Sequence, residues 1–341
     1  MLFRYKITPR SPLITALMSD TFFGHFCWAI RYREGESYLV DFLHSYGDEK
    51  PAPVIFSSAF ISGYLPRPAL PSLARESTKR FVEKHFGGGK MEFFEGLSKV
   101  KDWNKRRYVS TEQWLRLKDD YSEERLYEEF AKANVPYDER ALMEVATSNV
   151  IDRVSGTVPK EVGGLFQREK IWYYQKVDLD LYVEVNQDGV ATLTSWFLTE
   201  YLPENGFGAD KSVGMGSLSI THDESFDPNL LSVKDPNARL SLSLASFPTM
   251  EAYPAFYRLI TKFGRLGGSF AVASPTGGDP NPFKKPILMY EPGAVFFHSA
   301  SLNNKPLLGN IHSDKRIRHC GIPITLPFKI RQEVSYACYT A

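Results

Sequence analysis

The order of hydrophobic and polar positions near the start of the chain predicts a strand, a helix and a second strand. Residues 2–8 alternate between apolar and polar side chains, as a half-buried strand does. Ser19 or Asp20 is a suitable N-cap for a helix that runs to about Arg31. Apolar residues recur in it at helical spacing and predict one buried face: Phe22, Phe23, Phe26, Cys27 and Ile30. Residues 54–60 predict the second strand.

The middle of the chain predicts a polar insertion followed by a long β-hairpin. Residues 66–118 are polar, contain proline and are interrupted by glycine, and residues 86–90 predict a loop within them. A short acidic helix is expected over residues 123–133. Residues 145–151 and 165–175 predict the two arms of the hairpin, and residues 155–159 predict a turn between them.

The elements that follow complete the order β-α-β-β-α-β. Residues 181–186 predict a strand closed by Asp188-Gly189, and Leu193 to Leu202 have helical spacing that Pro203 and Asn205-Gly206 end. Another strand is expected over residues 215–220. This order is that of the ferredoxin-like (RRM-like) unit, an antiparallel sheet with helices on one face.

The remaining residues predict a second unit of the same kind. Strands are expected over residues 240–247, 267–274, 287–299 and 320–328. We therefore expect an α+β fold with two ferredoxin-like units, a long hairpin (thumb) insertion and a glycine-rich loop. The first domain would span residues 1–225, with the insertion and thumb at about 75–178. The second, degenerate domain would span residues 226–341.

Charge is segregated along the chain although the net charge is only +1. Residues 258–331 contain eleven Lys and Arg against three acids, and residues 75–118 contain twelve against six. Residues 119–144 contain nine acids against three basic residues. Basic surfaces of this kind suit phosphates, and the acidic segment suits docking of a protein.

The cysteines and the hydropathy pattern indicate the compartment. Cys27, Cys320 and Cys338 are few, odd in number and widely spaced, which argues against a disulfide framework. Charged residues interrupt the N-terminal apolar stretch, so no signal peptide is expected, and no apolar run approaches the length that spans a bilayer. We expect a cytoplasmic protein without a membrane partner.

A glycine-rich loop at residues 206–216 is the most distinctive local feature. It is not a P-loop, because Asp210 and not glycine precedes Lys211-Ser212 and a strand follows. A dinucleotide fingerprint would need glycine at position 211 and a helix beginning there. Two interpretations remain: the exposed N–H groups bind phosphates with help from Lys211, or the loop leads into a strand without a ligand.

The sequence shows no set of residues arranged for catalysis or metal binding. The seven histidines do not share a compact segment with suitable partners. His312, His319 and Cys320 lack a fourth ligand at zinc spacing. Three cations crowd that segment, which is then either a phosphate-facing loop or a plain exposed one: Lys315, Arg316 and Arg318. We expect no cofactor, no metal and no enzyme activity.

Three separated segments carry a family resemblance. They are residues 19–29, residues 148–156 followed by residues 163–166, and the glycine-rich loop. Together they resemble the RAMP superfamily, in its Cas5 group, as found in the fourth Csm-type subunits of type III-A CRISPR interference complexes. The resemblance implies a subunit that holds the 5′ repeat-derived tag of the CRISPR RNA (crRNA). It also implies docking to the large signature subunit and to a neighbouring backbone RAMP subunit.

The resemblance also implies roles for particular residues. Asn149 and Arg153 would organise the thumb, with Asp152 paired to Arg153, and Arg168 would reach the RNA. Phe207 and Tyr173 are candidates for base stacking, although Phe207 suits a plug under the loop equally well. His25 would serve local packing. The predicted RNA-binding residues come from three segments. They are Asn149, Arg153 and Arg168 of the thumb, Ser19 and Thr21 of the first segment, and the loop residues Gly206, Phe207, Gly208, Ala209, Asp210, Lys211, Ser212, Gly214, Met215 and Gly216.

Two other functions stay open at the level of the sequence. A guide-processing endoribonuclease of the same superfamily would cleave RNA without a metal. A stand-alone protein would bind single-stranded RNA without CRISPR partners.

Overall fold

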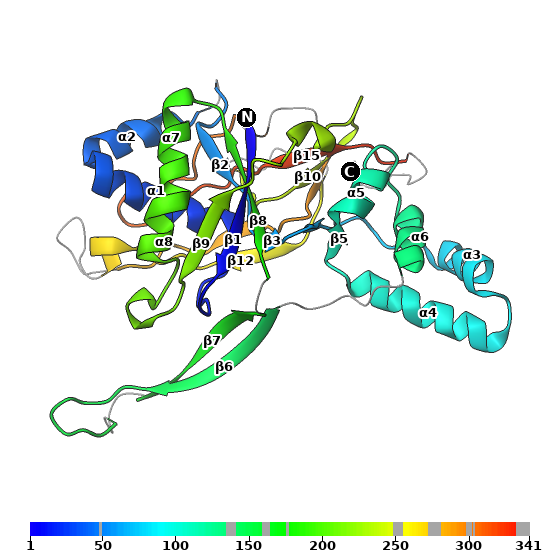
Figure 1. The fold of residues 1–341 in the computed structure, drawn as a ribbon, viewed down its shortest axis with the longest axis horizontal. Helices are drawn as coiled ribbons and strands as arrows, with labels where there is room; N and C mark the ends of the chain where they lie inside the picture. Colours follow the sequence, from blue (N-terminus) through cyan, green and yellow to red (C-terminus); the bar gives the residue numbers. More distant parts are fainter. Residues whose placement is uncertain are drawn as a thin grey trace.

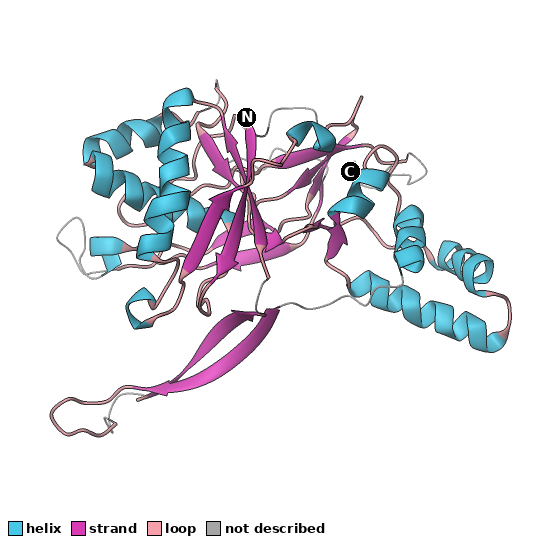
Figure 2. Cartoon of the chain, viewed as in Figure 1, coloured by secondary structure: helices cyan, strands magenta, loops and turns pink. Residues whose placement is uncertain are grey.

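The structure is a computed structural model that describes residues 1–47, 50–133, 141–158, 164–174, 177–247, 255–271, 281–297, 302 and 304–331. It is a mixed structure of helices and small antiparallel sheets (Figures 1 and 2). Parts of several predictions lie outside the described residues: Pro159 of the turn, Gly163 of the second family segment, Gln175 of the hairpin, residues 272–274 and 298–299, and Cys338. Among the described residues, no helix is long and apolar enough to cross a membrane.

The largest sheet is built around β1 (Leu2–Pro9). β1 pairs with β8 (Leu179–Val185) on one side and with β9 (Leu218–His222) on the other. β2 (Val54–Phe56) and the short β3 (Phe60–Ile61) both pair with β8, and every pairing is antiparallel. The strand order is therefore β2-β8-β1-β9.

Four helices gather beside this sheet (Figure 1). α1 (Ser19–Glu34) is confirmed and runs three residues further than predicted, but its N-cap is Met18, because Ser19 and Asp20 already lie in the first turn. It leads into α2 (Glu36–His44). α7 (Asp188–Trp196) continues through a π-helical stretch, Phe197–Tyr201, into α8 (Leu202–Asn205).

Two details of the last helical stretch differ from the prediction. Asp188-Gly189 does not close a strand, because both residues form the first turn of α7. Pro203 does not end the helix: it directly follows the π-helical stretch, in which the Leu202 N–H donates to the carbonyl of Phe197, and the helix continues through it. The helix ends at Asn205, and Gly206 follows with a φ of 72°.

Residues 66–118 form a lobe that is mainly helical. β4 (Tyr64–Pro66) pairs with β5 (Tyr108–Ser110), and α5 (Thr111–Leu117) follows directly. Between the two strands, α3 (Arg75–Phe86) and α4 (Lys90–Lys105) flank the predicted glycine loop at residues 87–89. The predicted acidic helix is confirmed as α6 (Glu123–Ala133). The polar composition of the insertion therefore reflects exposed helix faces and not loop structure.

The acidic segment offers less free charge than its composition indicates. Glu123 is buried beside Arg67, and Glu129 is buried with its carboxylate 2.7 Å from Arg116. Residues 134–140 of the segment lie outside the described residues. Two of the acidic residues expected to face a partner protein thus form ion pairs inside this chain.

The predicted hairpin is confirmed. β6 (Ala141–Asn149) pairs with β7 (Leu165–Tyr173) over nine residue pairs. It projects from the body of the molecule (Figure 1). Its base joins the body through an antiparallel bridge between Ile171 and Leu13, which exchange backbone hydrogen bonds of 2.8 and 3.0 Å.

The C-terminal half contains two small sheets. One has the order β11-β14-β10-β15, formed by β10 (Ala238–Ser241), β11 (Ala255–Phe256), β14 (Val295–Phe296) and β15 (Thr325–Phe328). The other pairs β12 (Leu259–Lys262) with β13 (Ile287–Tyr290). The strand expected from residue 267 onward is instead a 3₁₀ turn, Gly268–Ala271, in its described part.

One hydrophobic core runs through both halves of the chain. It includes Phe56 and Phe197 from the first half and Leu240 and Phe328 from the second, all at most 1% exposed. Backbone bonds cross the same boundary, since the Ser58 N–H donates to the carbonyl of Leu242 over 2.9 Å. Burial of this shared apolar surface ties the two halves together.

The helical lobe depends on a buried ion pair. Arg67 follows β4 and donates hydrogen bonds to the Glu123 carboxylate at the start of α6 and to the Trp103 carbonyl of α4. The two paired side chains are only 7% and 5% exposed. Removing one partner of a buried pair leaves the other charge without compensation.

We expect Glu123→Gln to lower the free energy of unfolding by about 3–5 kcal/mol, because Arg67 would remain charged and buried. Urea unfolding followed by circular dichroism measures this loss. Glu83→Gln is the matched control, since Glu83 pairs with Lys79 on the exposed face of α3 and should change stability by less than about 1 kcal/mol. Equal losses in the two variants would contradict a special role for Arg67.

Candidate nucleic-acid interface

The glycine-rich loop is closed by backbone contacts across its base. Phe207 donates its N–H to the Gly216 carbonyl over 2.8 Å, and Gly216 donates to the Pro12 carbonyl over 2.9 Å. A Cβ on Gly216 would lie 2.0 Å from the carbonyl oxygen of Phe207. Glycine is therefore required at position 216 by the approach of the chain's own backbone, independently of any ligand.

Phe207 lies beneath the loop and is completely buried. Its ring centroid is 4.8 Å from that of Phe22 in α1 and 4.8 Å from that of His25. No face of the ring is left for a nucleobase, so the prediction that Phe207 stacks on a base is wrong. The alternative prediction, that Phe207 is a plug under the loop, agrees with its burial. The ring fixes the loop to α1 through aromatic packing.

His25 supports the loop from α1. Its Nε2 accepts a hydrogen bond of 3.0 Å from the N–H of Gly208. Burial lowers the pKa of His25 to about 4, and the nearby charge of Lys211 acts in the same direction. The ring is thus neutral at physiological pH and acts as a hydrogen-bond acceptor, consistent with local packing.

The segment between β1 and α1 holds the loop from the other side. Ala209 donates its N–H to Thr15 Oγ1 over 3.1 Å, and Ser217 donates its own to Ser11 Oγ over 2.9 Å. A Cβ on Gly208 would lie 2.6 Å from the Cβ of Thr15. Gly208 therefore also permits a close approach within the chain.

Most N–H groups of the loop are used internally, so fewer remain for phosphates than the sequence suggests. Val213 and Met215 donate to the Asp210 carbonyl, and Gly214 donates to that of Lys211. The N–H groups of Asp210, Lys211 and Ser212 donate to no other described residue. They stand at the start of the 3₁₀ turn Lys211–Val213, whose side chains are exposed.

This open end of the loop has the features of an anion-binding concavity. Three adjacent N–H groups, a cation and a hydroxyl lie within three consecutive residues. Desolvation by neighbouring atoms lowers the pKa of Lys211, although its side chain stays exposed. Gly214 borders this end, and a Cβ there would meet nothing within 4 Å.

The hairpin and the loop meet through an ion pair. Arg168 Nη1 of β7 lies 3.1 Å from Asp210 Oδ2, and the guanidinium lies over the ring of Phe166. Both side chains remain partly exposed, at 35% and 27%. Two segments that the sequence singles out separately therefore form one surface.

The hairpin tip differs from the prediction in one contact. The Asp152 carboxylate accepts hydrogen bonds from the N–H groups of Val154 and Ser155, at 2.7 and 3.0 Å, and these bonds lower its pKa. No ion pair joins it to Arg153, and both residues are described, so this expectation is wrong. Asp152 shapes the turn, while Arg153 is exposed, as is Asn149 at the end of β6.

The N-terminal segment contributes to the interior more than to the surface. Ser19 is 6% exposed, and its Oγ accepts the N–H of Leu244 over 2.9 Å. Direct RNA contact by Ser19 is therefore excluded by burial. Thr21 is partly exposed, and its hydroxyl donates to the Asp20 carboxylate over 3.4 Å. Tyr173 is likewise packed on the core, and burial raises its pKa to about 12.

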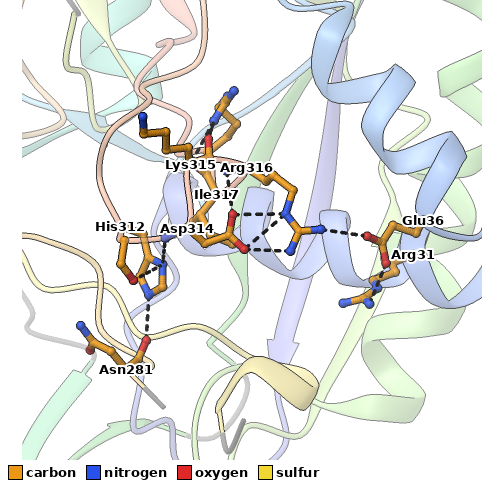
Figure 3. Close-up of polar contacts among 10 residues, drawn as sticks. Arg31, Glu36, Asn281, His312, Asp314, Lys315, Arg316 and Ile317 are labelled. Carbon is orange, nitrogen blue, oxygen red and sulfur yellow. Dashed lines mark hydrogen bonds and ion pairs between the residues drawn. The ribbon is translucent and has the colours of Figure 1, made fainter. Parts of the chain in front are cut away.

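The C-terminal basic loop is tied down by its own contacts (Figure 3). His312 Nδ1 accepts the N–H of Asp314, so its Nε2 donates to the Asn281 carbonyl over 2.7 Å. The Asp314 carboxylate pairs with Arg316, which also reaches Glu36 of α2. Both ring nitrogens of His312 are occupied, and the described residues contain no His, Cys, Asp and Glu cluster that could hold a metal ion.

Comparisons with known proteins give a result at the level of the fold. No family model and no curated protein sequence matches the chain. A crystal structure of a Csm1–Csm4 cassette in complex with cA4 matches with a TM-score of 0.53 and 15% identity, over 97% of this chain and 100% of that chain. A Csm1–Csm4 cassette in complex with pppApA matches with a TM-score of 0.52 and 16% identity, with the same coverage.

A third solved structure is the Csm3–Csm4 subcomplex of a type III-A CRISPR–Cas interference complex. It matches with a TM-score of 0.53 and 14% identity, over 96% of this chain and 99% of that chain. The fold is that of a subunit found in a type III-A CRISPR–Cas interference complex. More particularly, it is the fold of Csm4, which confirms the resemblance found in the sequence.

Two features of the site were missed by sequence reasoning. The segment at residues 9–15 contains no motif, yet it contacts both the loop and the hairpin. The pairing of Asp210 with Arg168 was also missed, because each residue was considered only as a contact for RNA. The alternation of β7 gives the only signal, since it places Arg168 on one face of the hairpin.

The close approach at Gly216 gives a direct test of the loop. Gly216→Ala should lower the melting temperature strongly, because the methyl group would overlap the Phe207 carbonyl. Gly214→Ala is the matched control: its φ of 86° is equally positive, but its Cβ would enter open space. The control should lose only about 1–2 kcal/mol. Similar melting temperatures for the two variants would contradict the described loop.

The buried acceptor role of His25 predicts a pH dependence of stability. The unfolded state takes up a proton on this ring near pH 6.5 and the folded state only near pH 4. Stability should therefore fall as the pH falls through this window, by up to about 3 kcal/mol. His25→Gln keeps a hydrogen-bond acceptor but does not titrate. Urea unfolding at pH 7 and pH 4.5 should show a smaller pH effect in this variant, and an equal effect would contradict the assignment.

Proposed function

We propose that this chain is a non-catalytic subunit of a type III CRISPR interference complex that binds the 5′ tag of crRNA. The observation that carries the proposal is the junction of the glycine-rich loop with the hairpin through Asp210 and Arg168. It places the open end of the loop and a protruding hairpin on one surface, in a chain with the fold of Csm4. Such a surface suits a single-stranded segment held by its backbone.

The loop would contact phosphates of the tag. The three N–H groups of Asp210, Lys211 and Ser212 are the donors available among the described residues of the loop. The charge of Lys211 adds long-range attraction, and Arg168 keeps a partly exposed guanidinium beside it. Gly206, Gly208 and Gly216 would serve by shaping the loop.

The hairpin would serve as a thumb that contacts RNA or protein outside this chain. A two-stranded hairpin is marginally stable in water unless its apolar side chains find a partner. Leu142, Met143 and Val145 on β6 are 54%, 59% and 57% exposed. Met143 and Val145 lie on one face of β6 and Leu142 on the other, and these exposed apolar side chains support a hairpin that is covered in an assembly. Asn149 and Arg153 would act at its exposed tip.

The domain organisation is part of the same proposal. The order β2-β8-β1-β9 with antiparallel neighbours is the order expected for a ferredoxin-like unit. We assign this unit to residues 1–225 and a second, degenerate unit to residues 226–341. Because both units share one core, we expect neither to fold without the other.

The solved structures with this fold support a proposal for the partners. By their names, those Csm4 structures contain Csm1 in one assembly and Csm3 in another. The corresponding partners of this chain would be the large signature subunit, which it would anchor at the base of the complex, and a neighbouring backbone RAMP subunit.

The geometry of three histidines argues against a role for them in RNA cleavage. His25 is a neutral acceptor inside the loop, and burial lowers the pKa of His319 well below its usual value. His312 has both ring nitrogens engaged. A general acid needs a protonated side chain that reaches the scissile group, and these three histidines do not meet that requirement.

The proposed function predicts binding of labelled guide RNA that requires the 5′ tag, in paired native and denaturing gels of the purified chain. The large subunit should strengthen the shift, and the RNA should stay intact. Lys211→Ala should weaken binding and reduce the salt slope by about 0.7, as loss of one phosphate contact does. Lys101→Ala, on an exposed position of α4, is the matched control.

Two outcomes would replace the proposal. A discrete cleavage product would make the chain a guide-processing endoribonuclease. Tight binding of RNA that does not depend on the tag, without any effect of the large subunit, would make it a stand-alone RNA-binding protein.

A further inference from the structure

A groove with a volume of about 560 Å³ lies where the end of β1 meets the base of the hairpin. Residues 9–12 form one wall. The other wall comes from the hairpin and includes Leu142, Trp172 and Tyr174. Trp172 and Tyr174 are 42% and 58% exposed, although tryptophan side chains are highly buried on average.

The groove shares its side of the hairpin with the junction to the glycine-rich loop. β7 alternates its side chains, so Trp172, Lys170 and Arg168 lie on one face. Arg168 pairs with Asp210 of the loop. The indole of Trp172 is held in place because its Nε1 donates to the Glu144 carboxylate on the paired strand. An aromatic ring is thus positioned and exposed on the same face as two cations.

Arg10 supplies a cation on the opposite wall. Its side chain is exposed and makes no hydrogen bond or ion pair with another described residue. Its backbone is fixed, because the Arg10 N–H donates to the Ser217 carbonyl over 2.8 Å, directly after the loop. The neighbouring Pro9 and Pro12 restrict the chain on either side. A backbone hydrogen bond therefore joins the groove wall at Arg10 to the residue that follows the glycine-rich loop.

We propose that this groove binds one nucleotide of single-stranded RNA, with its base against Trp172 and its phosphate near Arg10. The proposal rests on the proposed function and deepens it, since it names the residues that receive the strand beside the glycine-rich loop. Exposed aromatic faces next to cations are the combination that single-stranded nucleic acids require. The Glu144 carboxylate, beside the indole, offers an acceptor for an amino group of the base or for a 2′-hydroxyl.

The test is the affinity of the full-length chain for tagged guide RNA, measured with and without the groove side chains. Trp172→Ala should weaken binding about 5- to 100-fold, as loss of one base stack does. Trp172→Phe keeps an aromatic face and should stay within about threefold of the wild type. Phe94→Ala is the matched control, because Phe94 is 58% exposed on α4 of the helical lobe. Only variants whose melting temperature equals that of the wild type are compared.

Arg10 is tested by the salt dependence of the same binding. Arg10→Ala should lower the salt slope by about 0.7, whereas Arg80→Ala on the exposed face of α3 should leave it unchanged. A series of guide RNAs, each lacking the base at a single tag position, gives an independent measurement of affinity. One position should weaken binding to the wild type but cause no further loss with Trp172→Ala.

The outcomes separate the two proposals. If the wild type does not bind tagged RNA, the proposed function fails and the groove assignment falls with it. If the wild type binds but Trp172→Ala binds equally well, only the groove assignment is overturned. The groove assignment is also overturned if the variant binds RNA normally and instead loses the large subunit, because the groove would then receive a protein segment.

Discussion

The backbone between β1 and α1 is the constraint on which the site depends. Within a few residues this backbone accepts the N–H of Gly216 at Pro12 and exchanges two hydrogen bonds with Ile171 at Leu13, and the Thr15 hydroxyl accepts the N–H of Ala209. Because β1 is also an inner strand of the largest sheet, the loop and the hairpin are both fixed to the core through one short segment. A displacement of this segment would move both parts of the surface that we propose for RNA.

The glycines of the loop show that a glycine-rich motif can be required by close contacts within the chain, independently of any ligand. Gly216 and Gly208 are needed because Phe207 and Thr15 approach them closely. The buried ring of Phe207 and the acceptor nitrogen of His25 then hold the loop against α1. These internal contacts leave a small open end with a few donors, and such a preorganised end binds an anion at a lower entropic cost than a flexible loop.

The helical lobe shows why charge counts along a sequence overstate the charge of a surface. The acidic helix α6 turns Glu123 and Glu129 inward, where Arg67 and Arg116 neutralise them. The basic loop near the C-terminus behaves in the same way, since Asp314 holds Arg316 in place. Buried pairs of this kind fix the arrangement of helices and loops, while the exposed cations outside them remain available to partners.

The sequence by itself determined the elements whose signal is local. Alternation predicted β1, a turn between two strand-like arms predicted the hairpin, helical spacing predicted α1 and the stretch of α7 and α8, and separated motifs carried the superfamily resemblance. The sequence pattern did not predict the helices of the insertion. Because each of these helices buries only a narrow face, most residues of the segment are polar. Only the tertiary structure decided that Phe207 and Ser19 are buried and that Arg168 meets Asp210. Burial and pairing between distant segments depend on how elements pack, and neither a period nor a motif encodes that packing within one short stretch of chain.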